Sequence, residues 1–194
     1  MRFSSPTPDS LTSQQRSLFN RIAETRARST EEPLPGPFGP WLKIPHIGTH
    51  LCELGHALRF ESLFKSSVME IGILVTARHW QSNFEWFAHA PMARRAGVSE
   101  ADITAIYQGE RPEFIDANDQ LAFDTAEELL LTQSLSDETF ERLTAGLGED
   151  GAVNFIALIG YYMGVSAMLN AFDIPVPEGT TPPFPKTAKS VTQT

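Results

Sequence analysis

Cysteine is almost absent from this 194-residue sequence, which contains Cys52 alone. A single cysteine excludes an intrachain disulfide, and with it the small secreted folds that depend on a disulfide framework. Basic residues are also scarce, because 15 lysines and arginines stand against 24 aspartates and glutamates, for a net charge of −9. Since nucleic-acid binding needs a basic surface that neutralises phosphates, we expect no nucleic-acid partner.

Long uninterrupted hydrophobic runs are missing as well. The most apolar stretch is AVNFIALIGYYMGVSAMLNAF, residues 152–172, which Asn154, Ser166 and Asn170 interrupt. A membrane-spanning helix needs about 20 almost uninterrupted apolar residues, so this pattern favours a helix buried in a core or a subunit interface. Residues 1–15 also lack the apolar segment of a signal peptide. We therefore expect a cytoplasmic protein without a membrane partner.

What the sequence does contain is apolar residues at helical spacing, with no period-2 alternation of useful length. The fold class is therefore predicted to be all-α, with a single compact domain. The predicted helices cover residues 9–28, a segment that begins at Pro45, and residues 67–80, 82–96, 99–107, 118–133, 136–147 and 151–171.

Proline and glycine divide the chain into three parts. Residues 1–40 are predicted to form an N-terminal helix and a Pro/Gly-rich linker, in which STEEPLPGPFGP should have no regular structure. Residues 41–174 form the helical core. The proline-rich tail, residues 175–194, is expected to be an arm or disordered.

Candidate acid–base chemistry lies in the helix predicted for residues 82–96. Ser82, Glu85 and His89 stand at i, i+3 and i+7, so they share one helix face, and Trp86 adjoins it as an apolar wall. A carboxylate beside an imidazole fixes its tautomer and stabilises its protonated form, which suits a general acid–base residue. The alternative is that Glu85 only completes a capping box with Ser82.

Two other patterns leave alternatives open. Ser67 and Glu70 also match a capping box, so Glu70 has the same two interpretations. His46 and His50 at i, i+4 could bind zinc if the fold supplied a third ligand, although a polar helix face explains them as well. No glycine-rich phosphate loop is present, so nucleotide binding has no support.

A family resemblance is carried by the stretch MEIGILVTARHWQSNFEWFAHAPMARRAGVSEADI, residues 69–103. Its matching features are Glu70 at the start of one helix, the Glu85-Trp86-x-x-His89 turn, and the ending from Ala93 to Gly97. Together with GYYMGVSAMLNAFDIPVPEG, residues 160–179, it resembles the carboxymuconolactone decarboxylase family within the alkylhydroperoxidase D-like superfamily. The similarity covers roughly residues 45–179.

The resemblance implies an alkylhydroperoxidase D-like helical bundle that assembles as a homo-oligomer, a trimer or a hexamer, with the site near subunit contacts. In the peroxidase branch a Cys-x-x-Cys pair would stand where Ser82 and Glu85 are found here. Without a thiolate there is no nucleophile to reduce a peroxide, so thiol peroxidase activity is disfavoured.

The decarboxylase branch requires no cofactor, and its chemistry needs a group that stabilises an enolate-like anion and then delivers a proton. His89, held by Glu85 and with Glu70 in a relay, could serve as this catalytic group. Arg78 is the candidate cation for an anionic small-molecule substrate, beside Trp86 and Ser82. We therefore predict a decarboxylase of a small carboxylated lactone or related acid. The alternatives are a non-catalytic oligomeric scaffold and a metal-dependent enzyme using His46, His50 and Glu70 or His89.

Overall fold

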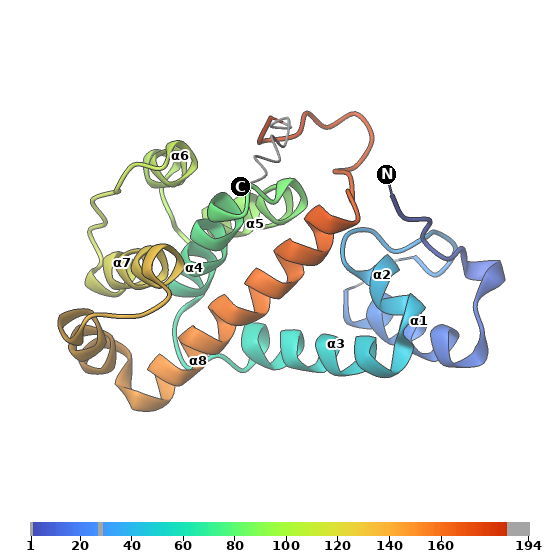
Figure 1. The fold of residues 1–194 in the computed structure, drawn as a ribbon, viewed down its shortest axis with the longest axis horizontal. Coiled ribbons are helices and arrows are strands. Elements are labelled where there is room, and N and C mark those ends of the chain that lie inside the picture. The colour runs from blue at the N-terminus through green and yellow to red at the C-terminus, as the bar shows by residue number, and fades with distance from the viewer. Residues whose placement is uncertain (1, 27–28, 186–194) are drawn as a thin grey trace, which may run out of the picture.

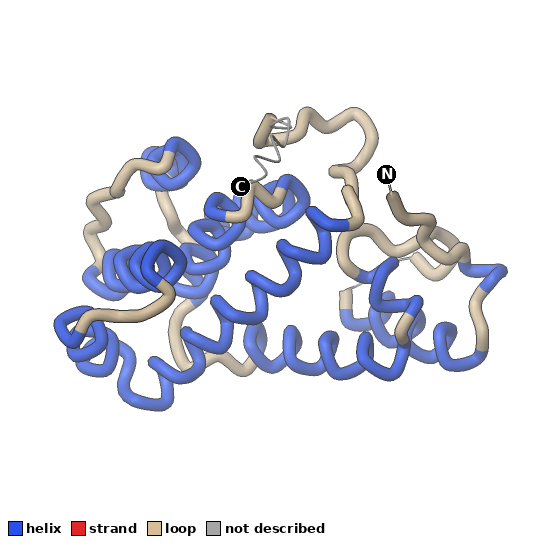
Figure 2. The backbone as a smooth tube through the Cα atoms, viewed as in Figure 1, coloured by secondary structure: helices blue, strands red, loops and turns tan. Residues whose placement is uncertain are grey.

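The structure is a computed structural model that describes residues 2–26 and 29–185, and in these residues it contains only helices, turns and loops (Figures 1 and 2). The prediction of an all-α fold is confirmed. A 3₁₀ turn at Pro8–Ser10 precedes the α-helices, which are α1 (Ser13–Thr25), α2 (Phe38–Lys43), α3 (Pro45–Phe60), α4 (Ser66–His79), α5 (Asn83–Arg95), α6 (Glu100–Gln108), α7 (Ala117–Thr132) and α8 (Asp137–Ala171).

The main core is organised around α4, which is buried from Ser67 to Ala77 and packs against α5, α6, α7 and α8. A helix that is apolar on all sides must be covered on all sides, which explains its central position. Helix α8 crosses the molecule between the group α4–α7 and the group α1–α3 (Figure 1). Phe155, Leu158 and Ile159 are fully buried on it. By length and composition alone α8 could span a membrane, but a core helix passes the same test.

Residues 136–171 were predicted as two helices and form one, with a break in its geometry. Gly148 has φ 74° and ψ 166°, outside the helical region, so the chain bends where the gap between the two predicted helices lay. Only glycine adopts such backbone angles without steric cost.

The N-terminal part forms a second, smaller core from the buried side chains of α1, α2 and the segment between them: Leu18, Phe19, Ile22, Leu34 and Leu42. The prediction that residues 29–40 have no regular structure was wrong at its end, because α2 begins at Phe38. Pro37 precedes this helix and Pro40 lies in its first turn, where a missing N–H removes no intrahelical hydrogen bond.

Residues 175–185 of the tail form an arm. The Phe184 side chain is buried between Trp86 and Tyr107, with ring centroids 5.5 and 5.3 Å away. Asn83 fixes the same residue, since its amide donates to the Phe184 carbonyl at 3.2 Å and accepts from the Phe184 N–H at 2.7 Å. The rest of the tail that was expected to be an arm or disordered, residues 186–194, lies outside the described residues.

Candidate active site

Helices α4 and α5 bring three ionisable side chains together in the interior. Glu70 Oε2 lies 2.7 Å from His89 Nδ1, and Glu85 Oε2 lies 3.5 Å from His89 Nε2. The three residues are only 2%, 5% and 3% exposed, respectively. Because an ionised carboxylate can only accept, Nδ1 carries the proton in the Glu70 contact and Nε2 faces Glu85. The imidazole is therefore held at both nitrogens, in one orientation.

Neither glutamate serves as a helix cap, so the capping-box alternative was wrong for both. Ser67 Oγ donates to Asp119 Oδ1 at 2.6 Å, and α4 begins at Ser66, which places Ser67 inside the helix. Ser82 is the N-cap of α5, yet its hydroxyl has no hydrogen-bond partner among the described residues. Both carboxylates face His89 instead, Glu70 from the neighbouring helix and Glu85 from one turn earlier in the same helix.

The electrostatics of this cluster favour proton exchange. Burial raises the pKa of Glu85, against the positive charges of His89 and Arg59, which lower it, and the negative charge of Glu70 adds to the rise. Glu85 therefore keeps its proton to higher pH than an exposed glutamate. A carboxyl group whose pKa is raised by burial and that lies beside an imidazole can donate a proton and recover it.

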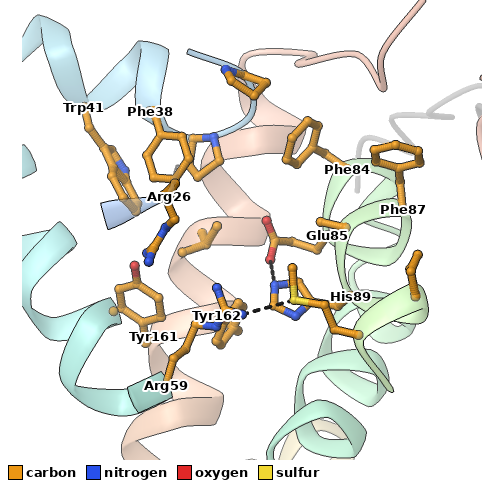
Figure 3. Close-up of a pocket in the computed structure, with 17 residues that line it drawn as sticks. Arg26, Phe38, Trp41, Arg59, Phe84, Glu85, Phe87, His89, Tyr161 and Tyr162 are labelled. Carbon is orange, nitrogen blue, oxygen red and sulfur yellow. Dashed lines mark hydrogen bonds and ion pairs between the residues drawn. The ribbon is translucent and has the colours of Figure 1, made fainter. Parts of the chain in front are cut away.

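A cavity of about 390 Å³ opens beside Glu85 and His89 (Figure 3). This volume is within the range of sites that bind small molecules. Three aromatic side chains of the N-terminal part and α5, Phe38, Trp41 and Phe84, form much of its wall. The remaining residues that line it are Arg26, Pro35, Pro37, Gly55, Arg59, Phe87, Ala88, Pro91, Met92, Tyr161, Tyr162 and Val165.

Two arginines also line this cavity. Arg26 follows the end of α1 and Arg59 lies in the last turn of α3, and the Phe60 ring lies near both, 5.6 and 5.3 Å from their Cζ atoms. Burial lowers the pKa of Arg26, and the charge of Arg59 lowers it further. Three buried donors on residues that line the cavity have no acceptor among the described residues: Arg26 Nη1, Arg59 Nε and Trp41 Nε1.

The tyrosines of α8 complete the floor. Tyr162 packs edge-on against His89 with ring centroids 5.1 Å apart, and burial raises its pKa well above the ordinary value. Tyr161 donates from its hydroxyl to the Leu51 carbonyl at 3.1 Å. A Cβ at Gly55 would overlap that hydroxyl, so glycine is needed here for α3 and α8 to approach.

The three residues predicted to bind substrate do not line this cavity. Arg78 lines a different depression, and its Nε donates to the Tyr107 carbonyl at 2.9 Å. Trp86 is buried on the opposite side of α5, against Tyr107 and Phe184. Ser82 is buried beneath the start of α5. Spacing on one helix therefore located Glu85 and His89 but none of the other residues that line the cavity.

Arg26 and Arg59, which sequence reasoning missed, come from segments far from the motif. Arg26 was predicted to lie at the end of an amphipathic helix, where a charged residue is ordinary. Arg59 lies in the last turn of a helix, where a cation is favourable because it interacts with the negative end of the helix dipole. Only the fold brings both to one cavity, so no local pattern could have identified them.

The histidines of the metal alternative lie elsewhere. His46 and His50 are exposed on α3, and His50 Nδ1 contacts Glu53 at 3.3 Å. Within residues 2–26 and 29–185, no group of three or more His, Cys, Asp or Glu side chains has an arrangement suited to a metal ion. The residues of that alternative therefore do not converge on one point.

Comparison with known proteins identifies the fold. The sequence matches no protein-family model, and a search of curated proteins found no match. Among solved structures, the chain is similar to an alkylhydroperoxidase AhpD core, an uncharacterised peroxidase-related protein from Ralstonia eutropha JMP134. The TM-score is 0.75 at 14% identity, over 91% of this chain and 92% of that one. The alkylhydroperoxidase D-like fold is thus confirmed, while the narrower resemblance to carboxymuconolactone decarboxylases depends on the motif residues alone.

Proposed function

We propose that the protein is a cofactor-independent acid–base enzyme that decarboxylates a small carboxylated lactone or a related acid. The observation that carries this proposal is the buried Glu70–His89–Glu85 cluster on the wall of a cavity of ligand size. Burying three ionisable groups is costly unless they are paired, and proteins keep such groups where chemistry needs them.

The proposed reaction divides its work among these side chains. The bond between the substrate carbon and its carboxylate breaks, carbon dioxide leaves, and the electron pair moves into an adjacent carbonyl to give an enolate. The pair formed by His89 Nε2 and Glu85 stabilises this anion through a proton held between them and then donates that proton to carbon. Glu70 orients the ring and stabilises its charged form. Solvent returns one proton to the pair for the next cycle.

Thiol peroxidase chemistry is a poor fit to this chain, although the structural neighbour is described as peroxidase-related. Ser82 and Glu85 occupy the positions where the peroxidase branch would have cysteines. The single cysteine, Cys52, lies on α3 in a separate depression, and burial raises its pKa to about 11. A thiol with this pKa is almost entirely protonated at neutral pH and is a weak nucleophile.

The test is a screen of small carboxylated lactones and β-keto acids for carbon dioxide release, followed by His89→Ala and Glu85→Gln on any compound that reacts. Both variants should lose about 10²–10⁴-fold in rate, the usual contribution of a positioned acid–base group. Exposed His50 provides the matched control, and His50→Ala should retain full activity. Undiminished turnover by His89→Ala would refute the proposal, and a complete absence of turnover across the screen would favour the oligomeric scaffold.

A further inference from the structure

Three residues that line the cavity have hydrogen-bond donors without acceptors among the described residues. Figure 3 shows Arg26 across the cavity from Glu85 and His89, whereas Arg59 extends from α3 to the Met92 sulfur, beside His89 on α5. Arg26 Nη1, Arg59 Nε and Trp41 Nε1 are each buried and lack a partner among the described residues. A buried donor without an acceptor costs roughly 1–3 kcal/mol, and a charged one costs more. All three residues line the cavity, so a ligand bound there would bring acceptors to these donor groups.

The charge of these residues indicates the sign of that ligand. Neither Arg26 nor Arg59 forms an ion pair within the described residues. Arg59 is held instead by a contact of its Nη2 with the Met92 sulfur at 3.1 Å, which carries no charge. Two neighbouring guanidinium groups without a counterion repel each other, so an anion between them would relieve the repulsion.

The remaining surface of the cavity indicates the shape of the ligand. Phe38, Trp41, Phe84 and Phe87 present ring faces and edges toward its interior (Figure 3). Aromatic walls favour a flat, conjugated body through stacked and edge-to-face contacts.

We propose that the cavity binds a planar aromatic or conjugated carboxylate, with Arg26 and Arg59 holding its carboxylate and Trp41 donating a further hydrogen bond. The claim that such a compound is the substrate rests on the proposed function, but the binding itself does not. The carboxylate in the arginine clamp is the one that the reaction keeps. Two guanidiniums stabilise the anionic form, which opposes loss of carbon dioxide from that group. The group that reacts is therefore a second group of the same molecule, one that lies against His89.

The probe is 2-naphthoate, a flat carboxylate, and its comparison compound is the neutral 2-naphthamide. Isothermal titration calorimetry should show that the full-length protein binds 2-naphthoate at least ten-fold more tightly than 2-naphthamide. Arg26→Met and Arg59→Met keep the aliphatic stem and remove the charge. Each should weaken naphthoate binding about ten-fold or more, since a charge-assisted hydrogen bond contributes about that factor. Arg95→Met on the exposed surface of α5 is the matched control and should leave binding unchanged.

Stability gives a second readout that separates a binding role from a structural one. Removing one of two unpaired like charges should leave the melting temperature of Arg26→Met and Arg59→Met equal to or above that of the wild type. If these arginines were structural, the same variants would melt earlier.

Several outcomes would overturn the inference: equal affinity for the amide and the acid, unchanged naphthoate binding in the double variant, or no naphthoate binding at millimolar concentration. The two proposals fail separately. Turnover by His89→Ala would refute the acid–base function and leave the anion site intact, whereas loss of the arginine effect would remove the anion site and leave the catalytic cluster.

Discussion

Replacing Glu70 by glutamine tests whether the contact at His89 Nδ1 is part of the chemistry. The substitution keeps the size of the side chain and removes its charge, so the 2.7 Å charge-assisted hydrogen bond becomes a neutral one. Charge-assisted bonds contribute about 1.5–3 kcal/mol and neutral bonds about 0.5–1.5, so we expect the free energy of unfolding to fall by about 1–2 kcal/mol. Both side chains are buried, so solvent screening does not reduce this value. For a protein of this size, the melting temperature should fall by about 2–8 °C.

The catalytic effect of Glu70→Gln should be much larger than its effect on stability. Without the carboxylate, the protonated ring is no longer stabilised and its tautomer is no longer fixed, so we expect a loss of about 10²–10⁴-fold in rate. The assays are calorimetric melting and turnover of the compound found in the screen. The ¹⁵N shifts of the His89 ring should place a proton on Nδ1 in the wild type.

The matched control for this experiment is Glu100→Gln, the same chemical change in the exposed ion pair with Arg94 on the surface. It should change neither melting nor rate. Full activity in Glu70→Gln together with lower stability would show that Glu70 only supports the fold. An unprotonated Nδ1 in the wild type would contradict the orientation inferred for the ring.

Three further predictions concern other parts of the molecule. Burial raises the pKa of Glu85 above the unfolded-state value of 4.5, so the contribution of protonated Glu85 to stability is complete below that pH and is lost as the pH rises. The melting temperature of Glu85→Gln relative to the wild type should therefore increase from pH 4 to pH 8. Parallel curves for the two proteins would contradict this prediction. No dithiol-dependent turnover of an alkyl hydroperoxide is expected, and activity abolished by Cys52→Ser would disprove that expectation. We also expect a homo-oligomer, a trimer or hexamer, because part of α8 is uncovered: Val153 is 72% exposed, and there is open space over Gly160 and Gly164. A monomer by light scattering at micromolar concentration would count against this expectation.

Periodicity and turn residues were sufficient to locate most of the helices. Helix α3 begins at Pro45 as expected, because proline is suited to a first turn, and α6 ends before Gly109, which has φ 77°. Sequence reasoning failed for α2, where two prolines close together concealed a helix that uses both at its start.

Within the candidate site, only the residues that share one helix face could be predicted from their spacing. Glu85 and His89 are neighbours by helical spacing, and the family resemblance added Glu70 from α4. Arg26 and Arg59 could not be identified from the sequence, because they are separated by 33 positions and are brought together only by the packing of α1 against α3. Arg78, the cation nearest to the motif in sequence, donates instead to the backbone at Tyr107.

The cavity has its acid–base groups on α4 and α5, whereas its unpaired donors belong to residues 26–59. These two sets lie on separate helices that meet in one packing cluster, because Trp41 packs with Phe84 of α5. Arg59 also reaches the other set, since its Nη2 contacts the Met92 sulfur on α5 at 3.1 Å. We therefore expect a library at Arg26, Phe38 and Trp41 to vary the ligand that the cavity accepts, whereas substitution of Arg59 should also change the environment of Glu85.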